Sequence, residues 1–358
     1  MKENKIRLKF KGSKHHRLLA FLLIIPMVFA LSACSSSTDE KDSKESTIEL
    51  YNMDTYMTVT AYGENADKAL EKVREEVNRI DKLLSTGLEE SEVYKINSGA
   101  ADALSEDTYK LLDKSLQLYK DTEGAFNIAV YPIMEAWGFT TKNYKVPDDE
   151  TIARLLTLAT PDDILFNRDE HKIAFAKEGM KIDFGGIAKG YTSARIMEIF
   201  KECGVKSGKV NLGGNVQTLG TKTDGSKWRI AIQSPDKGDE YAGVLEVADK
   251  AIITSGGYER FFEENGVTYH HIIDPKTGKP AKSGLQSVTI VSDDGTLADG
   301  LSTSLFIMGK DKSVEFWKKH KDEFQFVLLT DDNKLVASEG LKGSLTSDKY
   351  EVEFVSDK

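Results

Sequence analysis

Cysteine is almost absent from this chain, whose 358 residues include only Cys34 and Cys203. So few cysteines exclude a disulfide-rich scaffold, and no His/Cys cluster has the spacing of a zinc site. The stability of the fold must therefore come from a hydrophobic core, for which the chain is long enough. Cys203 ends an apparent helix from Ala194 and is expected to be a buried, unreactive thiol.

Positive charge is also scarce, because 48 Lys and Arg stand against 58 Asp and Glu, a net charge of −10. Nucleic-acid-binding proteins present a basic surface, so a nucleic-acid partner is not expected. The chain also lacks an internal repeat, and it lacks a domain linker after residue 47. We therefore expect a single large domain, at residues 48–352.

The N-terminus has the pattern of a lipoprotein signal peptide. A basic segment precedes an apolar run, Leu18 to Leu31, that is too short for a comfortable transmembrane span. The run ends in Leu31-Ser32-Ala33-Cys34, which resembles a bacterial lipobox. We expect removal of residues 1–33 and lipidation of Cys34, palmitate included. The alternative is an uncleaved signal anchor.

Residues 34–47 are expected to form a flexible tether, because Ser35 to Ser46 contains no apolar residue. A lipid on Cys34 would then hold the domain on the extracytoplasmic face of the cell membrane.

Hydrophobic periodicity predicts an α+β fold with mixed or antiparallel sheets and flanking helices, because helices and strands alternate irregularly. Helices are predicted at Asn65–Leu84, Ser105–Thr122, Asp148–Leu158, Tyr191–Cys203, Leu297–Met308 and Lys312–His320. Strands are predicted at Ile48–Tyr62 (one strand or a pair), Val210–Val216, Trp228–Gln233, Val244–Ile253 and Leu285–Val291. Hairpins are predicted at Ile164–Ala176 and at Phe324–Leu329 with Leu335–Ala337.

The most informative segment is Asp183-Phe184-Gly185-Gly186-Ile187-Ala188-Lys189-Gly190. A glycine turn lets the backbone approach a ligand, and the N-terminus of the following helix favours anions. Lys189 adds a mobile positive charge. The segment suggests a site for a phosphorylated ligand, although it lacks the spacing of a Walker loop. A plain turn is the alternative.

Asp299 and Thr303 are four residues apart in a predicted helix and therefore share one face. Carboxylate and hydroxyl oxygens are ligands that suit Mg²⁺. In the alternative interpretation, Asp299 is a helix N-cap and Thr303 a surface residue. The apolar character of this helix favours a buried Asp299, which would need a cation or several hydrogen-bond donors.

Two further segments carry candidate polar groups. Thr254-Ser255-Gly256-Gly257-Tyr258-Glu259-Arg260 is a hydroxyl-rich glycine turn after a strand, which exposes backbone donors. His270 and His271 are adjacent on a strand, so at most one of them enters a given pocket. A histidine in the pocket is a candidate general base, whereas most such histidines are structural or solvent-facing.

These four segments together resemble the ApbE-type FAD:protein FMN transferases, a family of bacterial flavin transferases that are often lipoproteins. The resemblance runs from about Tyr51 to about Gly309. It also includes Met53-Asp54-Thr55, Ser91-Glu92 to Asn97, Gly124-Ala125-Phe126-Asn127, Trp137-Gly138-Phe139, Asn211-Leu212-Gly213-Gly214-Asn215, and His271 to Pro275 with Thr277-Gly278. It implies a single T-fold-related domain.

The resemblance also implies the activity and the site. FMN would be transferred from FAD to a threonine hydroxyl of an extracytoplasmic protein, in a Ser/Thr-Gly-Ala-Thr-like sequence, with release of AMP. Mg²⁺ would be held by Asp299, Thr303 and the carbonyl of Gly186. His271 and Lys189 would be catalytic. The residues implied to contact FAD are Met53, Ala125, Phe126, Asn127, Asp183, Lys189 and Ile272.

Three positions depart from the family pattern. Asp54 stands where the family has the glycine of Met-Gly-Thr, and Asn127 replaces a frequent aspartate. Gly87 replaces a frequent tyrosine that can stack on the flavin, a role that Tyr94 or Phe126 would have to fill.

Other functions remain open at this stage. FAD hydrolysis to FMN and AMP would use the same residues. A lipoprotein that only binds flavin would not need the Asp299 and Thr303 pair. A solute-binding lipoprotein would need two similar lobes, which the sequence does not show.

Overall fold

The structure is a computed structural model that describes residues 44–236 and 241–358. The predicted signal peptide and Cys34 lie outside these residues. Within the described part of the chain, no helix is both long and apolar enough to cross a membrane.

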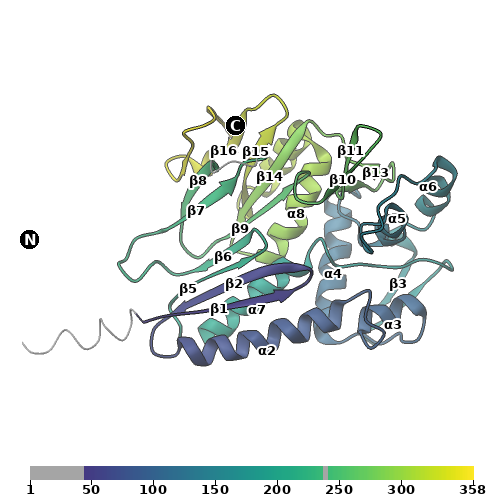
Figure 1. Ribbon diagram of the computed structural model, residues 1–358, viewed down its shortest axis with the longest axis horizontal. Coiled ribbons are helices and arrows are strands. Elements are labelled where there is room, and N and C mark those ends of the chain that lie inside the picture. Colours follow the sequence, from purple (N-terminus) through teal and green to yellow (C-terminus); the bar gives the residue numbers. More distant parts are fainter. Residues whose placement is uncertain (1–43, 237–240) are drawn as a thin grey trace, which may run out of the picture.

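A nine-stranded sheet organises the described residues (Figure 1), in the order β1-β2-β5-β6-β9-β14-β15-β16-β18. All neighbours are antiparallel except the parallel pair β16 and β18. Together with the flanking helices, this confirms the predicted α+β fold. The strands are β1 (Glu45–Asn52), β2 (Thr55–Tyr62), β5 (Ser207–Leu212), β6 (Asn215–Leu219), β9 (Ala251–Gly256), β14 (Leu285–Ser292), β15 (Phe324–Thr330), β16 (Leu335–Ser338) and β18 (Val352–Val355).

Smaller sheets and hairpins surround the main sheet. A three-stranded sheet has the order β17-β8-β7, from Leu345–Thr346, Tyr241–Val247 and Trp228–Gln233. The two-stranded pairs are β3 (Ile164–Asn167) with β4 (Lys172–Phe175), β10 (Phe261–Glu264) with β11 (Val267–His270), and β12 (Ile273–Asp274) with β13 (Lys279–Pro280).

The central strand β9 is buried on both faces, because Ile252 and Ile253 are neighbours that belong to different core clusters. Ile252 packs with the three-stranded sheet, whereas Ile253 packs with the helices. Such strands are continuously apolar, since alternate side chains point to opposite faces and both faces exclude water.

Helices cover the face that Ile253 belongs to. Helices α2 and α7 pack on β1, β2 and β5 through residues such as Val73 and Phe200, while α8 packs on β9 and β14. The helices are α2 (Ala66–Leu84), α3 (Glu92–Ser98), α4 (Glu106–Asp121), α5 (Tyr131–Trp137), α6 (Asp149–Leu156), α7 (Ala188–Glu202), α8 (Gly295–Met308) and α9 (Lys310–His320).

Two strand predictions are wrong because a turn interrupts each. Residues 210–216 contain the turn at Gly213-Gly214 between β5 and β6, where both glycines have positive φ, 62° and 98°. Residues 244–253 contain the last residues of β8, which ends at Val247, and the first residues of β9, which begins at Ala251. These two strands belong to different sheets. Apolar content marked these segments as strands but did not reveal the breaks.

Other boundaries also differ. α7 begins at Ala188 rather than Tyr191, and β1 and β18 extend slightly beyond residues 48 and 352. α3, α5 and the β10–β11 hairpin were not predicted. Cys203 is half-buried rather than buried, because it is the residue that ends α7. The predicted hairpins at 164–176 and 324–337 are confirmed.

Helices α7 and α8 cross closely because both have a glycine at the crossing. A Cβ atom at Gly190 would lie 2.1 Å from the carbonyl oxygen of Gly295 and 2.5 Å from the Cβ of Asp299. Real Cβ atoms do not approach other atoms so closely. The close approach of α7 and α8 therefore depends on Gly190 having no side chain.

We expect Gly190→Ala to lower the free energy of unfolding by about 1–3 kcal/mol, because the added methyl forces α8 away from α7. Gly87→Ala is the matched control, since a Cβ there meets no described atom within 4 Å. Urea unfolding of both variants measures the difference. Equal midpoints would contradict a tight crossing.

Candidate active site

A cleft with a volume of about 1060 Å³ lies where the β1–β2 turn, the start of α7 and one face of α8 meet. It brings together segments that are far apart in the sequence. Every site residue suggested by the sequence, except Cys34, lines it: Met53, Ala125, Phe126, Asn127, Asp183, Gly186, Lys189, His271, Ile272, Asp299 and Thr303.

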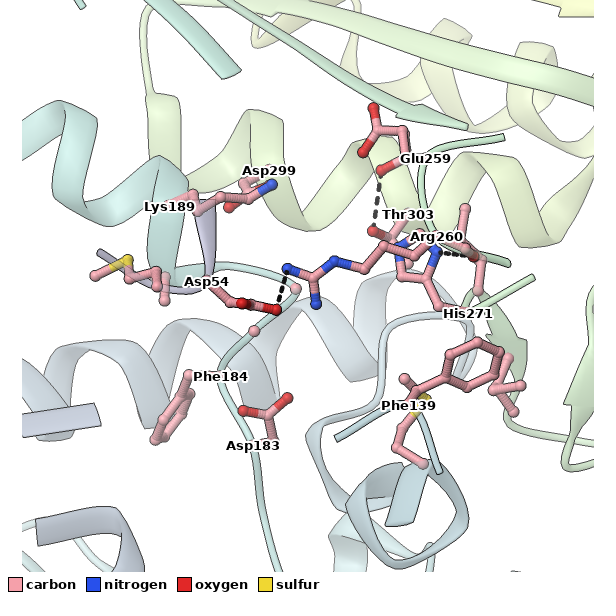
Figure 2. Close-up of a pocket in the computed structure, with 18 of the residues that line it drawn as sticks. Asp54, Phe139, Asp183, Phe184, Lys189, Glu259, Arg260, His271, Asp299 and Thr303 are labelled. Carbon is pink, nitrogen blue, oxygen red and sulfur yellow. Dashed lines mark hydrogen bonds and ion pairs between the residues drawn. The ribbon is translucent and has the colours of Figure 1, made fainter. Parts of the chain in front are cut away.

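The segment 183–190 forms a turn that leads into α7, as predicted. Asp183 precedes the two glycines, and its backbone N–H donates to the carbonyl of Ile128 at 3.0 Å. Desolvation raises the pKa of the Asp183 carboxyl above its ordinary value. Lys189 is in the first turn of α7, and Figure 2 shows it beside Asp299.

Asp299 lies within α8, not at its start. Asp294 is the N-cap, and its side chain accepts from Thr296 N–H, so the alternative assignment of Asp299 as a cap is wrong. Asp299 is only 4% exposed. Its Oδ2 accepts from the Gly190 N–H at 2.8 Å, and its Oδ1 accepts from the Asn215 amide at 2.9 Å.

Burial raises the pKa of the Asp299 carboxyl, and the charge of Lys189 opposes that rise. A buried carboxylate is costly unless donors or a cation compensate it. Two hydrogen bonds and the charge of Lys189 compensate part of the buried charge of Asp299. Each carboxylate oxygen can still accept a further partner. The carboxylate is therefore suited to a further cation.

Thr303 is one turn after Asp299 and also faces the cleft. Its hydroxyl lies 3.2 Å from that of Ser255, which in turn lies 2.8 Å from the hydroxyl of Ser302. Among the described residues, no group of three or more His, Cys, Asp and Glu side chains could hold a metal ion. A metal here would thus rely on one carboxylate with hydroxyl and backbone oxygens, which suits Mg²⁺ better than zinc.

His271 lines the cleft and His270 does not, so only one of the two enters the pocket, as predicted. The strand β11 ends at His270, however, so the prediction that both lie on one strand is wrong. The His270 ring packs edge-on against Phe306 and bonds to the carbonyl of Ala281. His271 Nδ1 lies 3.2 Å from the carbonyl oxygen of Arg260. A carbonyl can only accept, so Nδ1 carries the hydrogen and the neutral ring keeps a free lone pair on Nε2.

Burial, followed by the positive charge of Arg260, lowers the pKa of His271 to about 3. The ring is therefore neutral at ordinary pH. A neutral imidazole with a free Nε2 lone pair can accept a proton from a hydroxyl.

Charged residues that the sequence analysis did not single out also line the cleft. Glu259 and Arg260 are the last two residues of the segment 254–260, whose sequence suggested backbone donors but no role for these charges. Burial raises the pKa of Glu259, opposed by Lys189 and Arg260. The adjacent opposite charges in Glu259-Arg260 were the signal that could have identified them.

One of the departures from the family pattern, Asn127, has a structural explanation. The Asn127 side chain accepts from the Ala129 N–H and donates to the Ala159 carbonyl, and a carboxylate could not make that donation. Gly87 follows Thr86, which lines the cleft, and has open space around it. Of the suggested substitutes for a stacking tyrosine, Phe126 lines the cleft and Tyr94 does not.

Comparisons with known proteins agree on one family. The model of the ApbE family matches residues 53–328. The FAD:protein FMN transferase of Haemophilus influenzae is 29% identical over 346 residues, which cover 93% of this chain and 99% of that protein. The FAD:protein FMN transferase of Klebsiella pneumoniae is 31% identical over 294 residues, 80% of this chain and 90% of that protein.

Solved structures show the same likeness. The ApbE protein of Thermotoga maritima superposes with a TM-score of 0.79 at 32% identity, covering 86% of this chain and all of that chain. The flavin transferase ApbE of Vibrio cholerae has a TM-score of 0.75 at 25% identity, covering 84% of this chain and 99% of that chain. With a family match over most of its length and full-length relatives, the chain belongs to the ApbE family.

Proposed function

We propose that this protein is an FAD:protein FMN transferase that moves FMN from FAD to a threonine hydroxyl of an acceptor protein and releases AMP. The observation that carries the proposal is the single cleft in which Asp299, Thr303, Lys189 and His271 meet. Family membership and the names of its relatives make the chain a transferase.

The acceptor hydroxyl attacks the phosphorus of the FMN half of FAD. A new P–O bond forms to the threonine oxygen, the bond to the AMP phosphate breaks, and AMP leaves. The hydroxyl proton passes to Nε2 of His271, whose Nδ1–H remains on the Arg260 carbonyl. Lys189 offsets negative charge on the pyrophosphate as the bond breaks.

The residues of the cleft fit Mg²⁺. Asp299, the Thr303 hydroxyl and the Gly186 carbonyl would hold it, since all three residues line the cleft and offer hard oxygen ligands. When bound, the ion would neutralise charge on the pyrophosphate oxygens.

The acceptor and the location belong to the same proposal. The acceptor carries a Ser/Thr-Gly-Ala-Thr-like sequence, and the enzyme works on the extracytoplasmic face of the membrane, anchored by a lipid on Cys34. The family resemblance supports the acceptor, and the lipobox-like Leu31-Ser32-Ala33-Cys34 supports the anchor.

We expect Asp299→Ala to reduce FMN transfer at least about a hundredfold, because the variant loses the buried carboxylate of the proposed metal site. The assay combines the purified chain with FAD, Mg²⁺ and a protein carrying the acceptor sequence, and measures the acceptor's intact mass. EDTA should abolish the FMN adduct of the unaltered enzyme.

Asp294→Asn is the matched control, since it changes a carboxylate of the same helix that does not line the cleft and asparagine is an equally good N-cap. Its transfer rate should be unchanged. FMN and AMP released without an acceptor adduct would instead indicate FAD hydrolysis, and intact FAD would indicate a binding protein.

The His271 ring should remain neutral from pH 8 to pH 5, because its pKa of about 3 lies below the ordinary value and protonation begins only as the pH approaches 3. NMR titration of histidine-labelled protein measures this, with His271→Ala to assign the signal. A midpoint near 6.5 would contradict the lowered pKa of His271. His271→Ala should also lower transfer by about 10²–10⁴-fold, and an unchanged rate would remove His271 from the reaction.

Gly87→Tyr should tighten FAD binding by about two- to tenfold if the new ring stacks on the flavin. The φ angle of Gly87 is not positive and open space surrounds it, so the thermal midpoint should not change. Titration of flavin fluorescence measures the affinity, and Gly87→Ala controls for the loss of glycine. Weaker binding by Gly87→Tyr would show that position 87 does not face the flavin.

A further inference from the structure

The β1–β2 turn places a carboxylate at the edge of the cleft. Asn52 pairs with Thr55, which leaves a two-residue turn whose residues Met53 and Asp54 have φ of 50° and 56°. Glycine adopts this left-handed conformation at the lowest cost, and the family pattern has glycine at position 54. An aspartate here therefore suggests a use for its side chain.

The two oxygens of Asp54 have different partners. Oδ1 accepts from Lys142 Nζ at 2.8 Å and from the Tyr51 hydroxyl at 2.9 Å. Arg260 Nη2 approaches Oδ2 at 3.6 Å. The hydrogen bond from Lys142 keeps the pKa of the Asp54 carboxyl below its ordinary value, so the carboxylate is charged. Three separate segments of the cleft thus meet at one side chain.

Arg260 extends across the cleft toward Asp54, with Asp183 nearby (Figure 2). A distance of 3.6 Å is too long for a good hydrogen bond, and the side chains of Arg260 and Asp54 are 47% and 42% exposed. Exposed ion pairs of this kind contribute little and exchange partners readily. A guanidinium also matches phosphate oxygens in a bidentate geometry that this contact does not use.

We propose that Arg260 is a phosphate-binding residue of this cleft and that Asp54 is a carboxylate that competes with the ligand's phosphates for it. The proposal rests on the proposed function in taking FAD as the ligand. When FAD binds, its pyrophosphate replaces Asp54 Oδ2 on Arg260, while Oδ1 keeps Lys142 and Tyr51. Asp54 therefore lowers the affinity for phosphate-bearing flavins specifically.

Binding measured by calorimetry, with EDTA and without acceptor, tests the proposal free of turnover. Asp54→Asn removes the charge and keeps a residue that tolerates positive φ. It should lower the Kd for FAD about two- to fivefold, the scale of an exposed ion pair. Arg260→Gln should raise that Kd at least about tenfold, because a charge-assisted hydrogen bond is lost.

The double variant separates competition from simple repulsion. If Asp54 acts through Arg260, Asp54→Asn should have little effect in the Arg260→Gln background. Repulsion between Asp54 and the ligand would give the same gain in both backgrounds and would overturn the proposal. Riboflavin, which has no phosphate, should bind the unaltered chain and Asp54→Asn equally.

Asp67→Asn controls for net charge, because Asp67 pairs with Lys44 and does not line the cleft. It should leave FAD binding unchanged, and an equal gain would overturn the role of Asp54. If FAD binds and Asp54→Asn has no effect, this inference fails while the proposed function stands. If no flavin binds even when Mg²⁺ replaces EDTA, both fail.

Discussion

The buried carboxylate of Asp299 is the contact on which the cleft depends. It accepts one hydrogen bond from α7 at Gly190 and one from β6 at Asn215, so it joins two segments to α8. The close crossing at Gly190 and Gly295 makes this geometry possible. Because the carboxylate is buried and its pKa is raised, folding places an incompletely compensated charge at the point proposed for the metal and the pyrophosphate. The same atoms therefore hold the helices together and prepare the site.

Much of the site was predictable from the sequence because its chemistry is carried by short segments. Asp299 and Thr303 share a helix face by spacing alone. Only one of His270 and His271 enters the cleft, as predicted, although β11 ends at His270. The glycines of the 183–190 turn identified a close approach of the backbone. Long periodic helices such as α2 were also predictable, since Val73, Val77 and Ile80 repeat on one buried face.

The remaining features depend on contacts between distant segments. Nothing near Asn127 in the sequence indicates that its amide bonds to the carbonyl of Ala159, 32 residues later. The pair of Asp54 and Arg260 joins a turn at one end of the sheet to the residues after β9. The breaks at 213–214 and between β8 and β9 were missed because apolar content is the same on both sides of each turn. Tertiary packing decided these features, and local patterns carry little information about it.

The β1–β2 hairpin has a consequence for where the enzyme can work. Its turn forms one wall of the cleft, and the other end of β1, at Glu45, is close to where the described chain begins. Eight extended residues span about 26 Å, at about 3.3 Å per residue. β1 thus acts as a rigid spacer between the N-terminal side of the domain and its cleft. A flexible tether joined to the domain at the start of β1 would therefore attach one strand length away from the cleft. The length of β1 and the length of the tether would together set which acceptor hydroxyls the cleft can reach.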